Sequence, residues 1–190
     1  MEDESFAQNI EIINQSESYN PKTNQPDYKA VSLFFNPESG AFIKGISNTI
    51  GIQVKDCNEL GIQIMEGLVL DSKGNTITTF FTNKMGYGKF ELTPDANETY
   101  SVKINTDKLK TEKQLPKATN SGIAITYNNN LPNNVLEVAV NTNSDGVNLY
   151  HNKNYTLLIH QNGKHIQKEF NFNDKNPNQR LTFDKNDLAN

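Results

Sequence analysis

The chain has no tryptophan, one cysteine and no long apolar run, and each shortage narrows the class of protein it can be. Because Cys57 is alone, no disulfide can form within the chain. That fits the cytosol, and it fits equally a periplasmic or surface domain large enough to need no cross-link. No apolar segment approaches the roughly 20 residues of a transmembrane helix. The 18 basic residues are outnumbered by 22 acidic ones, so we do not expect a nucleic-acid-binding protein.

The start of the chain also lacks the apolar segment of a secretory signal peptide. Met1 to Ser5 is acidic, and no apolar run of the required length follows it. From these residues we expect either a cytoplasmic protein or an exported one whose signal has been removed.

What the sequence does contain is a series of short segments in which apolar and polar residues alternate. Ile50, Ile52 and Val54 alternate with polar residues or glycine, which predicts a strand with one buried face. Similar segments recur roughly every 8–12 residues up to Ile104, a spacing typical of antiparallel β-sandwiches. The stretch 71–75, Asp-Ser-Lys-Gly-Asn, predicts a hairpin turn. We expect an all-β chain of immunoglobulin-like sandwiches.

A second group of strand-like segments follows a charged stretch, residues 106–117, which we interpret as an interdomain connection. Asn162-Gly163 predicts a two-residue type I′ hairpin turn. We therefore predict a tail with one stray strand at 1–26, a first sandwich at 27–105 and a second at 106–190. The second offers about five strands against about seven in a closed sandwich, so we interpret it as incomplete. An incomplete sandwich leaves an open sheet edge, and we expect self-association through residues near 166–183.

The amino-acid sequences of several segments resemble those of macroglobulin-like domains in large exported proteins of Bacteroidetes-type bacteria. Residues 33–45 resemble the opening of such a domain, although 36–40, Asn-Pro-Glu-Ser-Gly, replace the usual Gly-Gly pair and so change the loop's shape. Further matches to the family pattern are 61–62, 67–75, 85–90, 93–94 and Tyr100. Residues 115–118 and 157–164 resemble the next domain of an array, and 10–12 resemble the last strand of a preceding one.

This resemblance implies a non-catalytic structural or interaction module of a larger cell-envelope protein, located in the periplasm or at the cell surface. Its partners would be neighbouring domains or another envelope protein. Protease trapping in α2-macroglobulin relatives needs a Cys-Gly-Glu-Gln thioester, whereas Cys57 lies in Asp-Cys-Asn-Glu. We therefore expect no enzyme and no cofactor. The alternative is a ligand-binding module for glycans, peptides or a protein partner.

The strongest candidate for site chemistry is a pair of histidines. Counting outward from Asn162-Gly163 places His160 opposite His165 on one face of the hairpin, where two imidazoles could hold a transition-metal ion. Protein zinc sites usually have three or four ligands, so we favour two ordinary surface histidines.

Aromatic residues in loops are the other candidates for recognition, namely Tyr19, Tyr28 and Tyr87. Consecutive strand residues point to opposite faces, so one member of Phe34-Phe35 and one of Phe80-Phe81 must leave the core face of its sheet. We interpret Cys57 as an unremarkable loop residue.

Overall fold

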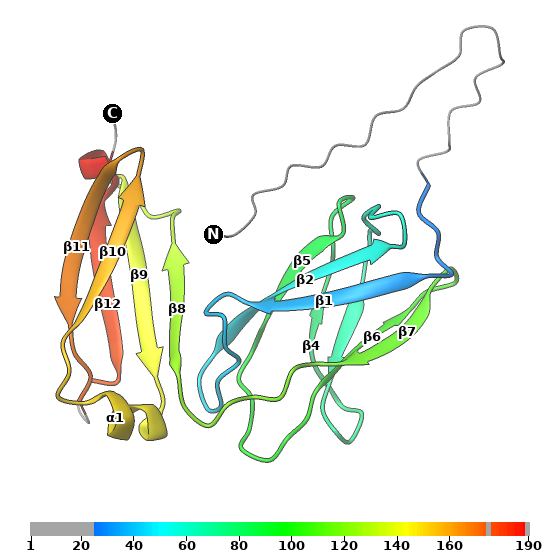
Figure 1. The fold of residues 1–190 in the computed structure, drawn as a ribbon. Helices are drawn as coiled ribbons and strands as arrows, with labels where there is room; N and C mark the ends of the chain where they lie inside the picture. The colour runs from blue at the N-terminus through cyan, green and yellow to red at the C-terminus, as the bar shows by residue number, and fades with distance from the viewer. Residues whose placement is uncertain (1–24, 174–175, 189–190) are drawn as a thin grey trace, which may run out of the picture.

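The computed structural model describes residues 25–173 and 176–188 (Figure 1). Within these ranges the chain forms antiparallel strands in four sheets with one short α-helix, which confirms the all-β prediction. No helix in the described part is long and apolar enough to cross a membrane. The stray strand expected at 10–13 lies outside the described residues.

The first unit is a sandwich of two sheets. One has the order β1-β2-β5 and the other the order β4-β3-β6-β7. The bounds are β1 Val31–Pro37, β2 Asn48–Asp56, β3 Gly67–Leu70, β4 Thr76–Phe80, β5 Tyr87–Leu92, β6 Ser101–Asn105 and β7 Lys110–Gln114. Burial along β2 alternates at every residue, because one of its faces covers the core and the other does not.

Apolar side chains from both sheets form the core of this unit. Its fully buried members include Ile50, Ile52 and Val54 from one sheet and Val69, Val102 and Ile104 from the other. Gly67 is required at its position because a Cβ there would lie 2.2 Å from the Phe80 ring. The register of the β3–β4 pairing shifts two residues later, between Val69 and Leu70.

The stretch 106–117 differs from the expected connection. It contains β7, which pairs with β6, and Leu109 and Leu115 at its two ends are buried in the first core. Ala118 also belongs to that core, so the chain leaves the first unit after residue 118. An edge strand of this kind needs no apolar alternation, since its backbone supplies the pairing.

The second unit contains a three-stranded sheet of order β12-β9-β8 and a separate hairpin, β10-β11. The bounds are β8 Ile123–Asn128, β9 Val135–Thr142, α1 Ser144–Tyr150, β10 Tyr155–Gln161, β11 Lys164–Phe170, β12 Asn178–Asp184 and the 3-10 helix η1 Lys185–Leu188. Val138, Val140, Phe172 and Phe183 form its buried core. Within the described residues this unit has five strands, two fewer than the first.

Candidate functional site

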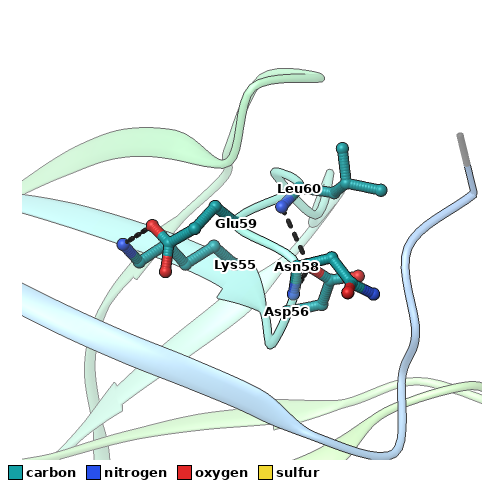
Figure 2. Close-up of polar contacts among 5 residues, drawn as sticks. All are labelled: Lys55, Asp56, Asn58, Glu59 and Leu60. Carbon is teal, nitrogen blue, oxygen red and sulfur yellow. Dashed lines mark hydrogen bonds and ion pairs between the residues drawn. The ribbon is translucent and has the colours of Figure 1, made fainter. Parts of the chain in front are cut away.

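Asp56 organises a loop of the first unit that several hydrogen bonds hold together (Figure 2). The residue is 2% exposed. Its carboxylate accepts the backbone N–H groups of Asp27 at 2.8 Å, Asn58 at 2.8 Å and Leu60 at 2.9 Å. These bonds, that from Asp27 first, hold the pKa of Asp56 below its usual value. Because all three donors are backbone groups, this carboxylate has a structural role, closing the loop and anchoring the chain's entry to β1.

Cys57 lies at the tip of this loop with its side chain exposed. Beside it Glu59 adopts a φ of 65° and pairs with Lys55, as Figure 2 shows. Cys57 is a free thiol in this loop.

The histidine pair lies where the sequence predicts it. His160 is the register partner of His165, and the turn residues Asn162 and Gly163 have φ values of 51° and 81°, as a type I′ turn requires. Both imidazoles are exposed. No group of three or more histidine, cysteine or carboxylate side chains within 25–173 and 176–188 is placed to hold a metal ion.

The candidate tyrosines fall in different environments. Tyr19 lies outside the described residues. Tyr28 packs against the first core beneath the ammonium of Lys108, 5.6 Å from the ring centroid, so it is not free for recognition. Tyr87 is 52% exposed. On adjoining backbone segments Met65, Phe81 and Met85 are also exposed, so four large apolar side chains are exposed in this region.

Each phenylalanine pair divides as the alternation predicts. Phe80 is 4% exposed and Phe81 71% exposed. Phe34 faces outward with the ammonium groups of Lys55 and Lys113 at 4.8 Å and 5.8 Å from its ring centroid. The outward Phe34 ring, 41% exposed, therefore makes cation–π contacts with lysines of its own unit.

The turn at 71–75 is a closed hairpin turn. Asp71 Oδ1 accepts the N–H groups of Lys73 and Asn75, and its other oxygen accepts the Asn75 amide at 2.9 Å. These bonds, the Asn75 side chain first, lower the pKa of Asp71. The carboxylate is used locally, as its interpretation as a turn residue predicts.

Sequence reasoning missed the joint between the two units. Ser39 Oγ donates to Ile125 O at 3.2 Å and accepts Ile125 N–H at 2.7 Å. The Asn143 amide donates to Lys44 O at 2.9 Å and Asn120 O at 2.6 Å. The same side chain accepts Gly146 N–H and so caps α1. Asn143 followed by Ser-Asp is a helix-start signal that the sequence offers. The sequence gives no signal for the contact between Asn143 and Lys44.

The connecting segment itself adds backbone bonds to the joint. Thr119 N–H donates to Phe42 O at 2.7 Å, and Lys44 N–H donates to Thr119 O at 3.0 Å, forming a parallel bridge between Ile43 and Thr119. Ile43 is fully buried, and a Cβ on Gly122 would lie 2.7 Å from its Cδ1. The two units are thus in direct contact.

Two polar clefts flank this joint. One, about 940 Å³, is lined by residues such as Lys44, Asp95 and Asn148. The other, about 930 Å³, is lined by Lys89 and Glu91 of the first unit and by Tyr127 and Arg180 of the second. Arg180 is paired with Glu137 at 2.7 Å within the second cleft. Both clefts draw their walls from both units.

No protein-family model matches this chain, and neither does any curated protein.

Proposed function

We propose that the chain is a non-catalytic structural and interaction module of a larger exported protein, and that its two β units hold neighbouring parts of that protein at a fixed spacing. The resemblance to macroglobulin-like domains supports the extracytoplasmic location. The antiparallel two-sheet architecture of the first unit agrees with such a role.

The observation that carries the proposal is the joint. A flexible linker would leave the units without mutual bonds, whereas here Ser39, Lys44 and Asn143 all bond across the boundary. Interfaces between domains of one chain usually permit motion unless the interface is large and hydrophobic, so here the fixed spacing has to come from the bonds of the joint. Several bonds at separate points resist both hinge and twist, which is what a spacer needs.

The test is a distance distribution between spin labels on the two units. Cys57 is the only cysteine and is exposed, so it takes one label without mutation, and exposed Gln167→Cys takes the other. We expect a single narrow distance peak. Asn143→Asp keeps the acceptor that caps α1 but removes the amide donor to Lys44 O of the first unit and the donor to Asn120 O of the connecting segment, so it should broaden the peak. Asn152→Asp makes the same chemical change away from the joint and should not. A broad distribution in the unmodified joint would refute the spacer.

The second candidate is a ligand-binding module, favoured by the cleft of about 930 Å³ that combines an exposed tyrosine, Tyr127, with amides and both signs of charge. An aromatic face beside several planar polar groups suits glycans or peptides. A saturable rise in melting temperature with a soluble glycan, lost in Tyr127→Ala, would favour this function over the spacer.

A further inference from the structure

The outward face of the hairpin β10-β11 carries two histidines that the fold sets against each other. On the inward face Tyr155, Leu157 and Ile159 pack against the second core. Consecutive strand residues point to opposite faces, so His160 and its register partner His165 point away from that core. Both side chains are exposed. The pair is therefore accessible to small solutes.

The type I′ turn decides which kind of register pair these histidines form. Beside a two-residue hairpin turn, Gln161 and Lys164 form a hydrogen-bonded pair, and hydrogen-bonded and non-hydrogen-bonded pairs then alternate. His160 and His165 are thus a non-hydrogen-bonded pair, in which the Cα atoms lie about 4.5 Å apart and the side chains approach most closely. With metal–nitrogen bonds of about 2.0 Å, two nitrogens at adjacent corners of a square lie about 2.8 Å apart. Rotation of the two exposed rings about their side-chain torsions can bring one nitrogen of each to that separation.

The surroundings of the pair suit a cation. Leu158 and Gln167, the next register pair along the same face, are uncharged. Lys164 and Lys168 alternate onto the inward face, where Lys168 donates to Thr182 O. A metal ion bound to the two imidazoles would therefore meet no ammonium group at the neighbouring outward positions of its own hairpin.

The number of protein ligands decides which ion fits. Within residues 25–173 and 176–188, no third histidine, cysteine or carboxylate joins the pair in a group that could hold a metal ion. Zinc sites in proteins usually have three or four protein ligands, so two imidazoles alone do not suit zinc. Cu²⁺ accepts tetragonal coordination by nitrogen and oxygen, and it binds a given set of such ligands more tightly than the other divalent first-row ions. Two imidazoles at adjacent corners leave the remaining positions to water.

We propose that His160 and His165 form a binding site for a divalent copper ion on the outward face of β10-β11. Each imidazole supplies one nitrogen ligand, and water completes the coordination. Because both ligands are held on one hairpin, the second bond forms intramolecularly, which raises the affinity about 10²–10⁴-fold over that of a single histidine. The site belongs to the second unit alone and does not depend on the proposed spacing function.

The test titrates Cu²⁺ into the whole chain labelled with ¹⁵N. Below one equivalent, the paramagnetic ion should broaden the amide signals of residues 159–166 first, and electron paramagnetic resonance should show two nitrogen ligands. The matched variant combines His160→Thr with Thr156→His, which keeps the composition and uses two exposed positions of the same face. It moves one imidazole four residues along β10, about 13 Å at about 3.3 Å per residue. The Kd for Cu²⁺ should therefore rise about 100-fold or more.

A control addresses the third histidine of the chain. His151 lies at the end of α1, where its Nδ1 is 3.1 Å from Val147 O, so His151→Gln should leave the Kd for Cu²⁺ unchanged. If the double variant fails to fold, His165→Gln alone makes the same comparison at one exposed position.

Three results would overturn the proposal. The first is equal affinity of the unmodified chain and the double variant for Cu²⁺, and the second is broadening centred on His151 or on the amino terminus. The third is tighter binding of Zn²⁺ than of Cu²⁺, which would show that further protein ligands join the pair. Neither histidine takes part in the joint, so this test and the spacing test can fail independently.

Discussion

Replacing Asn48 by alanine should destabilise the first unit and loosen the joint together. Asn48 is 3% exposed and clamps the loop before β2, accepting Ile43 N–H at 2.9 Å and donating to Ile43 O and Ile46 O, each at 2.8 Å. Alanine leaves the N–H and C=O of Ile43 without these bonds at a fully buried residue. An unpaired buried polar group costs about 1–3 kcal/mol, so we expect a loss of about 2–4 kcal/mol in the free energy of unfolding.

Urea denaturation followed by circular dichroism measures this loss. With a slope of about 2 kcal/mol per molar urea, the midpoint of the first unit's transition should fall by about 1–2 M. Asn97→Ala removes an exposed asparagine without a side-chain bond and should leave the midpoint unchanged. The spin-label distance distribution should also broaden in Asn48→Ala, since Ile43 bridges to Thr119. A change below about 0.5 kcal/mol would refute the argument that this amide is needed to satisfy Ile43.

Two further predictions concern acid stability and the second core. The pKa of Asp56 is lowered in the folded state, so the stabilisation from its charged form is present above the ordinary pKa of about 3.9 and is lost as the pH falls through the folded pKa. Melting temperatures measured from pH 7 to pH 2 should therefore fall less steeply below about pH 4 in Asp56→Asn than in the unmodified chain. Parallel curves for the two proteins would contradict this. Phe172, 1% exposed and packed against the rings of Tyr155 and Phe170, should cost about 3–5 kcal/mol on replacement by alanine. Phe81→Ala at an exposed site is the control, and an equal effect of the two would show that Phe172 is not a core residue.

The features that could be predicted from the sequence are those fixed by neighbouring residues. Asn162-Gly163 sets both the turn type and the register, so it placed His160 opposite His165 correctly. The Asp71 turn and the outward rings of Phe34 and Phe81 follow from the same local rules. Strand alternation is likewise a local property, and it was enough to predict the all-β class.

The features that could not be predicted depend on contacts between distant residues or on strands without a pattern. In β7 the sequence Lys-Thr-Glu-Lys-Gln has no apolar face, because its pairing is made by backbone groups and by bonds such as Ser101 Oγ to Glu112 at 2.7 Å. At the joint, Asn143 is hydrogen-bonded to Lys44, and the two residues are 99 positions apart in the sequence. No periodicity or turn signal carries information over that distance.

The division of the chain at residue 118 bears on the order in which the protein folds during synthesis. Every buried member of the first core lies between Leu33 and Ala118. A nascent chain can therefore complete that core once Ala118 has emerged, before any strand of the second unit exists. Thr119 and Asn143 would then meet a preformed surface around Lys44, so the first unit would act as the template on which the later part of the chain is aligned.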